Sequence, residues 1–236
     1  MADRPILFSG PMIRALLEGK KTQTRRVIEP CEPAPLVWRG DKPAPNCIMV
    51  KVPARHGGFM AGPTFNPRYA TGDRLWVRER FAISGIGWGK KPSEARGGKV
   101  HHHADPEHGW HDYWGSWRPS IHMPRWASRL TLIVTDVRVQ RLQDISEADA
   151  QAEGIERMKT GRGYYDPTVS KAMVRAGVWH SKASQAFEAL WDSLNADRAP
   201  WASNPWVCAV SFTVQHCNID RQGVPPAKPA ILEGVS

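Results

Sequence analysis

Two lysines, two threonines and two arginines lie close together near the N-terminus, within residues 19–26. A threonine hydroxyl is a weak nucleophile until a base removes its proton, and a lysine can be that base only when its amine is neutral. Lys21 and Thr24 are the candidate pair, because the neighbouring cations and partial burial would both favour the neutral amine. The alternative is that this basic segment is solvated or contacts phosphate, as charged clusters usually are.

Local signals place this segment between a helix and a strand. Apolar residues recur at three- and four-residue spacing over residues 10–18, after Ser9 as an N-cap, and predict a short amphipathic helix. Gly19 fits the left-handed position that follows a helix. The alternation from Thr22 onward predicts that a strand opens there. Lys21 therefore lies at the joint, where a turn would let its side chain converge with that of Thr24.

Two glutamates are candidates for the acid. The sequence 146–149 resembles a capping box, and Gly154 ends a short helix whose last residue is Glu153. The negative end of the helix dipole disfavours ionisation there and would keep a proton available, although an exposed surface glutamate is the alternative. Glu79 lies on the apolar face of a predicted strand over residues 75–81. Such a carboxylate either pairs with an arginine or faces a ligand.

The remaining pattern predicts one α+β domain over residues 1–220. Alternating residues predict a long central strand over 130–139 and a last strand over 206–214. Helical spacing of four apolar residues predicts a helix whose stripe faces the core: Phe187, Leu190, Trp191 and Leu194. Stretches that are rich in proline and glycine or lack periodicity are expected to be insertions, about 29–70, 84–120 and 156–181, with 29–70 a long irregular connection. Residues 221–236 are expected to form a loosely ordered tail.

Composition limits the class of protein. The 236 residues, 41% of them hydrophobic, can bury a sizeable core. No apolar run has the length of a membrane span and no signal peptide is visible, so we expect a cytoplasmic protein without a membrane partner. Four cysteines without a CxxC pair favour reduced thiols. The net charge of +9 makes an anionic partner such as RNA plausible.

Histidines and tryptophans offer further candidates. The histidine-rich stretch could supply metal ligands, but its spacing matches no established motif and no cysteine accompanies it, so no metal and no other cofactor is expected. Its members are His101, His102, His103, Asp105, His108, His111 and Asp112. Eleven tryptophans are many for this length. Trp76 or Trp206 could stack on a nucleobase, with core packing as the alternative for each.

The spacing GxKxxTxR at Gly19, Lys21, Thr24 and Arg26, followed by the segment 71–77, resembles the ASCH domain. The resemblance continues at 145–154 and 204–212. The segment 123–126 and the insertions are similar to the longer, phage-associated branch of that family. The resemblance implies a PUA-like β pseudobarrel with a mixed sheet, short flanking helices and long loop insertions.

Small ASCH proteins resembling this chain include N4-acetylcytidine amidohydrolases. The resemblance implies Lys21 as the base, Thr24 as the nucleophile and Glu153 as the acid, with Glu79 as the competitor for that last role. Arg26 or a backbone N–H would stabilise the oxyanion, and Glu79, Trp76 and Trp206 would contribute to substrate binding. The expected reaction releases cytidine or cytosine and a carboxylic acid from an acylated cytosine nucleoside, without a metal.

Two rival functions use the same basic loop. PUA-like domains often bind RNA, so a non-catalytic RNA-binding module is one alternative, and a ribonuclease is another. An amidohydrolase should cleave a free acylated nucleoside with little salt dependence. A binding module should instead show steeply salt-dependent affinity for RNA and no turnover. The preferred acyl group and the oligomeric state stay open.

Overall fold

The computed structural model describes residues 1–30, 48–53, 59–84, 91–105, 117–167, 174 and 177–221. The helices in these ranges are α1 (Gly10–Leu17), α2 (Glu147–Ala152) and α4 (Ala183–Asn195). The strands are β1 (Asp3–Leu7), β2 (Gln23–Val27), β3 (Ile48–Pro53), β4 (Phe59–Phe65), β5 (Arg74–Arg78), β6 (Phe81–Ser84), β7 (Lys99–His102), β8 (Thr131–Arg141), β9 (Glu156–Arg157), β10 (Tyr164–Tyr165) and β11 (Trp206–Gln215). No described helix is long and apolar enough to cross a membrane.

One mixed five-stranded sheet organises the molecule, in the order β1-β5-β8-β11-β2. β1 and β5 are parallel, whereas β8 pairs antiparallel with β5 and β11, and β11 pairs antiparallel with β2. The expected α+β class and the central position of the strand over 130–139 are confirmed. No backbone ladder joins β1 to β2 in the described part of the chain, so the sheet is open between these two edges. The helix α1 connects the two edge strands along the chain.

A bulge explains the change of hydrophobic parity along the long strand β8. Val134 pairs with Phe212, and Asp136 pairs with Ser211, so Thr135 is an extra residue on β8. Because an extra residue shifts every later side chain to the other face, the apolar residues that pack on the larger core are Leu132 and Val134 before Thr135, and Val137 after it. The sequence shows the same switch, from Leu132 and Val134 to Val137 and Val139.

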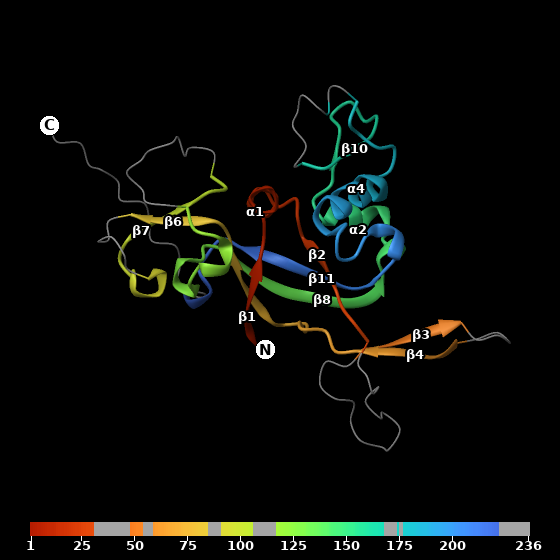
Figure 1. The fold of residues 1–236 in the computed structure, drawn as a ribbon, viewed down its shortest axis with the longest axis horizontal. Coiled ribbons are helices and arrows are strands. Elements are labelled where there is room, and N and C mark those ends of the chain that lie inside the picture. Colours follow the sequence, from red (N-terminus) through yellow and green to blue (C-terminus); the bar gives the residue numbers. More distant parts are fainter. Residues whose placement is uncertain are drawn as a thin grey trace, which may run out of the picture.

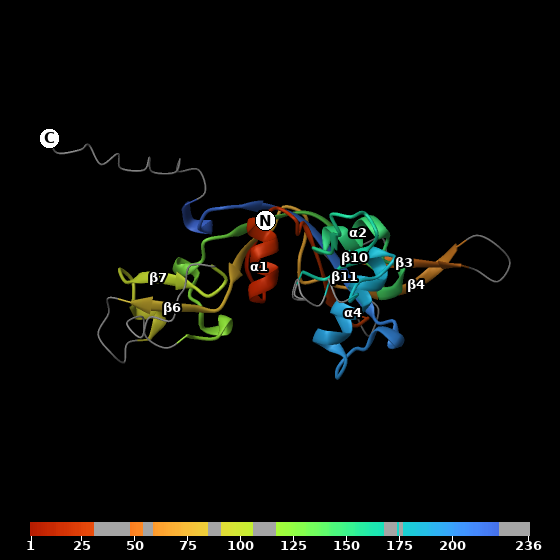
Figure 2. The same cartoon turned by 90° about the horizontal axis from the view of Figure 1, so that it is seen from above.

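The two faces of the sheet pack against different helices. One face forms the larger core with the apolar side of α1, including Ile13 and Leu16, which are fully buried. The other face packs against α2 and α4 through Phe187 and Trp191. Figures 1 and 2 show α1 in the middle, α2 and α4 on one side and the β6–β7 hairpin on the other. The residues of β2 alternate between these two faces.

The segments expected as insertions contain paired strands. β3 pairs with β4, β6 with β7, and β9 with β10, each as a separate two-stranded sheet. The interpretation of 29–70 as irregular is therefore wrong for residues 48–53 and 59–65, because proline and glycine hid a hairpin whose backbone groups satisfy one another. In Figure 1 this hairpin projects from the body of the molecule. The tail expected over 221–236 lies outside the described residues after Arg221.

Two local expectations differ from the structure. The strand predicted over residues 75–81 is broken, because β5 ends at Arg78 and β6 begins at Phe81, and Glu79 lies between them. Its alternation was nevertheless informative, since residues 75, 77, 79 and 81 are all buried. The helix over 183–195 buries Phe187, Leu190 and Trp191, but Leu194 is 54% exposed. Leu194 lies in the last turn of α4, beyond the part that packs against the sheet.

Candidate functional site

The turn after α1 directs Lys21 into the protein. Gly19 has a φ of 69°, and the backbone N–H groups of Lys20 and Lys21 both donate to the carbonyl of Ala15. This is the left-handed ending that glycine allows after a helix. The N–H of Thr22 then donates to the Ala152 carbonyl of α2 at 2.8 Å. These bonds leave the Lys21 side chain only 1% exposed.

Lys21 and Glu153 form a buried pair. Lys21 Nζ lies 2.8 Å from Glu153 Oε2 and donates a second hydrogen bond, also of 2.8 Å, to the Glu153 carbonyl. Glu153 is the C-cap of α2, as the capping pattern predicts, and Ser146 Oγ accepts the N–H of Asp149 at the other end of that helix. Gly154 follows with a φ of 106°, so the chain turns tightly where α2 meets Lys21. The sequence analysis named both residues as candidates, but it paired Lys21 with Thr24 and did not predict the contact with Glu153.

The surroundings of Lys21 lower the pKa of its amine. Burial lowers the pKa of Lys21 below its ordinary value of 10.5, because an ammonium group loses hydration in the interior. The Glu153 carboxylate opposes this effect through its charge and hydrogen bond, whereas the positive charges of Arg26 and Arg25 add to it. A neutral amine next to a threonine is the condition for the base that the sequence predicts.

A second cation holds the other oxygen of Glu153, and sequence reasoning missed it. Arg25 Nη1 lies 3.0 Å from Glu153 Oε1, and its Nη2 lies 3.2 Å from Asp149 Oδ2. Gln23, which shares a strand face with Arg25, accepts from Arg25 Nη1 at 2.5 Å and donates to Asp149 Oδ1 at 3.1 Å. The signal was the alternation of β2, which places two polar side chains toward the helix that carries Glu153.

Thr24 and Arg26 lie on the opposite face of β2. Thr24 pairs with Val210 and is 3% exposed, and its hydroxyl forms no hydrogen bond with any described residue, Lys21 included. Arg26 Nη2 donates to the Leu7 carbonyl at 2.8 Å. Both basic groups lie near the ring of Phe8, with Lys21 Nζ 5.9 Å and the Arg26 guanidinium carbon 5.5 Å from its centre. Arg26 therefore bridges the two edge strands beside Lys21.

Glu79 belongs to a separate cluster. Both of its oxygens accept from Arg129, at 2.9 and 3.0 Å, and His102 Nδ1 lies 3.2 Å from Oε1. Although burial would raise the pKa of Glu79, its contacts with His102 and Arg129 outweigh burial and hold that pKa below its ordinary value. The pairing with an arginine that the sequence suggested is present. No ion pair or hydrogen bond links Glu79 to Lys21, Thr24 or Glu153.

The two candidate tryptophans lie beside arginines. Trp76 on β5 is half-buried, with the Arg78 guanidinium carbon 5.2 Å from its ring centre. Trp206 at the start of β11 contacts the ring of Phe65 at 4.9 Å between centres, and Arg141 lies 4.3 Å over its ring. Protein side chains thus occupy part of the stacking surface of each tryptophan.

The histidine-rich stretch is described only in part. His101 Nε2 is hydrogen-bonded to Ser84 Oγ at 2.8 Å, and the ring of His103 packs edge-on against Trp117. Among the residues that the structure describes, no three His, Cys, Asp or Glu side chains are grouped so as to hold a metal ion. His108, His111 and Asp112 lie outside those residues.

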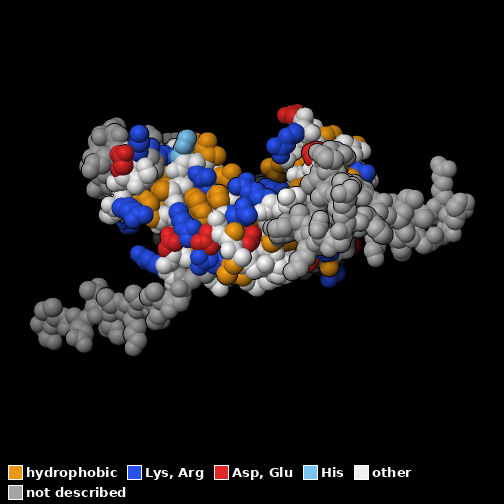
Figure 3. Space-filling model, turned by 90° about the horizontal axis from the view of Figure 1, so that it is seen from below, with side chains coloured by type: hydrophobic (Ala, Val, Ile, Leu, Met, Phe, Trp, Pro, Cys, Tyr) orange, Lys and Arg blue, Asp and Glu red, His pale blue; other side chains and the backbone are white. Residues whose placement is uncertain are grey.

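Two further features lie apart from the pair. Burial raises the pKa of the Cys208 thiol to about 12, which makes it a poor nucleophile. An open hollow at the start of α4 is lined by Trp179, His180 and Glu188 and by none of the residues around Lys21. Figure 3, seen from below, shows basic side chains over much of the described surface, with acidic ones among them and a notch in the outline between the two sides of the molecule.

Comparison of the chain with protein-family models, with characterised proteins and with solved structures found no significant match. The arrangement around Lys21, with a buried Lys–Glu pair, a threonine three residues away and no described hydrogen bond on its hydroxyl, therefore carries the functional argument.

Proposed function

We propose that the protein is an amidohydrolase that cleaves the N4-acyl amide of an acylated cytosine nucleoside. The observation that supports it best is the 2.8 Å hydrogen bond between the buried side chains of Lys21 and Glu153. The residues of the GxKxxTxR spacing thus include a lysine whose pKa is lowered, beside a carboxylate at hydrogen-bond distance. We also propose that the fold is a PUA-like pseudobarrel of the ASCH type. In this fold α1 and Arg26 would connect the open edge strands β1 and β2.

The Lys21–Glu153 pair can supply a base and an acid at once. Transfer of one proton from Lys21 Nζ to Glu153 Oε2, along their hydrogen bond, leaves a neutral amine beside a protonated carboxyl. The amine then takes the proton of Thr24 Oγ1 while that oxygen attacks the amide carbon. The carboxyl gives its proton to the departing N4 amino group of cytosine. An acyl-threonine ester remains, and the ammonium and carboxylate are restored.

Hydrolysis of the ester repeats the same proton transfers. The neutral amine of Lys21 takes a proton from water, the resulting hydroxide attacks the ester carbon, and Thr24 leaves with the proton that Glu153 holds. The carboxylic acid is released. Arg26 is the cation beside Lys21 that can stabilise the oxyanion, since among the described residues its Nη2 donates only to the Leu7 carbonyl. The contact between Lys21 and Thr24 must form in the substrate complex, where catalytic hydrogen bonds commonly tighten.

The test is a chromatographic assay of the purified protein with N4-acetylcytidine. We expect cytidine and acetate, no effect of EDTA and little effect of salt. Thr24→Ala should abolish turnover, Thr24→Ser should retain part of it, and Thr22→Ala, which changes the exposed threonine two residues earlier, should behave as the wild type. An enzyme that EDTA inactivates and a divalent ion restores would exclude this mechanism.

A binding function would give a different result in the same assay. The net charge of +9 favours contact with nucleic acid. Affinity for RNA that falls steeply with salt, without release of cytidine from N4-acetylcytidine, would make the protein an RNA-binding module. Cleavage of RNA by the wild type but not by Thr24→Ala would favour the ribonuclease.

A further inference from the structure

Charged side chains of alternating sign lead from the surface to Lys21. Arg138, whose side chain is 43% exposed, lies 2.9 Å from Asp149 Oδ1. Asp149 Oδ2 lies 3.2 Å from Arg25 Nη2, and Arg25 Nη1 lies 3.0 Å from Glu153 Oε1. Glu153 Oε2 lies 2.8 Å from Lys21 Nζ. The proposed reaction uses only the last two groups, so the role of Arg25 needs its own explanation.

Arg25 is held in one orientation. Its side chain is fully buried, and its guanidinium carbon lies 5.8 Å from the centre of the Phe187 ring. Gln23 accepts from Nη1 and also donates to Asp149 and to Ser211 Oγ, which fixes the acceptors around the guanidinium. Because a guanidinium is planar and its N–H groups point in fixed directions, such contacts leave Glu153 little freedom to rotate.

We infer that Arg25 is a positioning residue for the Lys21–Glu153 pair. It holds Glu153 by Oε1, leaves Oε2 directed at Lys21, and contributes the charge that sets how readily the pair gives up its proton. This inference depends on the proposed function only for its activity measurement.

The charged groups that face Lys21 determine whether loss of Arg25 raises or lowers the pH at which the pair titrates. These are Glu153 at the end of α2 and the cations Arg25 and Arg26 of β2, while β1 is followed by the uncharged ring of Phe8. A positive charge beside the pair disfavours a proton on the amine and on the carboxylate alike. Removal of Arg25 should therefore raise the pH values at which the pair as a whole gives up its protons.

The central experiment compares the pH dependence of turnover in the wild type with that in Arg25→Gln. The one-proton pair is active, so turnover should rise and then fall with pH. In Arg25→Gln both limbs should move to higher pH by about one unit or more, as expected for loss of one cation within a few ångströms. Arg25→Lys keeps the charge but loses the two fixed N–H groups of the guanidinium. It should therefore lower turnover, with a smaller displacement of both limbs of the pH profile.

A second variant, Asp149→Asn, distinguishes an effect on the Lys21–Glu153 pair from a general loss of folding. Asp149→Asn removes the negative charge that offsets Arg25, so both limbs should move to lower pH, in the opposite direction. The matched control is Arg129→Gln, which removes the guanidinium from another buried glutamate, Glu79. It should lower stability without displacing either limb, because no described contact links that cluster to Lys21.

A readout without substrate separates this inference from the proposed function. NMR of protein labelled in the lysine side chains can follow the titration of Lys21, whose signal is identified by its absence in Lys21→Arg. We expect a higher midpoint in Arg25→Gln and a lower one in Asp149→Asn. Displaced midpoints without hydrolysis of any acylated cytidine would retain the positioning role and reject the proposed function. Midpoints and pH limbs equal to those of the wild type would overturn the inference.

Discussion

Burial of the Lys21 amine determines what the residue can do chemically. Its pKa is below 10.5 because the ammonium loses hydration, so the alkaline limb of turnover should fall below that pH. Arginine at this position would keep the charge and the reach but would hold its proton far above neutral pH. We therefore expect Lys21→Arg to lose activity by at least about 100-fold, nearly as much as Lys21→Ala. Steady-state assays with N4-acetylcytidine measure this.

The double variant of Lys21 and Thr24 provides the control for that prediction. Groups that act as one unit are strongly non-additive, so the double alanine variant should be little worse than either single variant. A Lys21→Arg enzyme with nearly normal turnover would show that the site needs only a positive charge. The basic loop would then be better interpreted as an anion or RNA contact.

Glu153 and Glu79 are both buried, but their partners predict different phenotypes. Glu153 contacts the amine of Lys21, so Glu153→Gln should lower turnover by about 100-fold or more while the protein stays folded. Glu79 is held by Arg129 and His102, so Glu79→Gln should mainly lower the free energy of unfolding, by about 1–2 kcal/mol, because the partly buried Arg129 loses this charged partner while it keeps Asp105. Denaturant titration and turnover assays of both variants should distinguish these two phenotypes. The reverse result would show that Glu79, and not Glu153, is the acid.

Among the elements, α2 is too short to be stable alone and depends on its neighbours. Glu147 in its first turn accepts the backbone N–H of Ala183 at 2.7 Å and the hydroxyl of Ser184 at 2.5 Å, so it caps the start of α4. The Ser184 hydrogen bond and the Ala183 N–H hold the pKa of Glu147 below 4.5. A carboxylate whose pKa is lower in the folded state than in the unfolded state stabilises the fold at pH values above its unfolded-state pKa. This contribution disappears as the pH falls through its folded-state pKa.

Glu147→Gln should therefore destabilise the protein by about 0.5 kcal/mol at neutral pH, at the low end for a capping residue because Glu147 is exposed. The difference from the wild type should shrink as the pH falls below 4.5. Urea unfolding at several pH values measures it. Glu188→Gln on α4 is the control, since Glu188 has no hydrogen bond or ion pair among the described residues. An equal loss at every pH would show that the charge of Glu147 does not matter.

The same elements show what the sequence can and cannot predict. Helix α1, the capped α2 and the alternating strands follow from local spacing, and so does the location of Glu153 at a helix end. The contact of Arg25 with Asp149 joins residues that are distant in sequence, so no local pattern specifies it. The hairpin β6–β7 was missed because a glycine-rich stretch gives no period, although its strands pair over Phe81 and His102.

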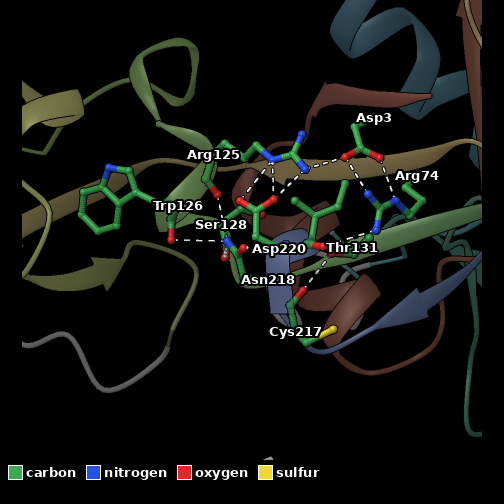
Figure 4. A network of polar contacts seen from close by, with 10 residues as sticks. Asp3, Arg74, Arg125, Trp126, Ser128, Thr131, Cys217, Asn218 and Asp220 are labelled. Atoms are coloured by element: carbon green, nitrogen blue, oxygen red, sulfur yellow. Dashed lines mark hydrogen bonds and ion pairs between the residues drawn. The ribbon is translucent and has the colours of Figure 1, made fainter. Parts of the chain in front are cut away.

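In the molecule as a whole, a network of ion pairs connects residues near the two ends of the described chain. Asp3 pairs with Arg74 at 2.7 Å and with Arg125 at 2.5 Å, and Arg125 also pairs with Asp220. Figure 4 shows this network, with Asn218 placed beside the turn that carries Arg125. The N-terminal strand, the turn over Arg125–Ala127 and the segment after β11 are thereby joined. The edge strand β1, whose Leu7 carbonyl accepts from Arg26, is thus anchored at its other end.

Asn218 should contribute most to this anchoring, because its amide replaces hydrogen bonds that a turn cannot make for itself. Asn218 Nδ2 donates to the carbonyls of Arg125 at 2.8 Å and Ser128 at 2.7 Å, with Trp126 at 3.3 Å. Asn218→Ala should lower the free energy of unfolding by about 1–2 kcal/mol, since these partly buried carbonyls lose their donor. Asp220→Asn, which changes an exposed neighbour, should cost less than about 1 kcal/mol. Denaturant titration of both variants measures the difference, and equal losses would show that the surface ion pairs, rather than the amide, hold the two ends together.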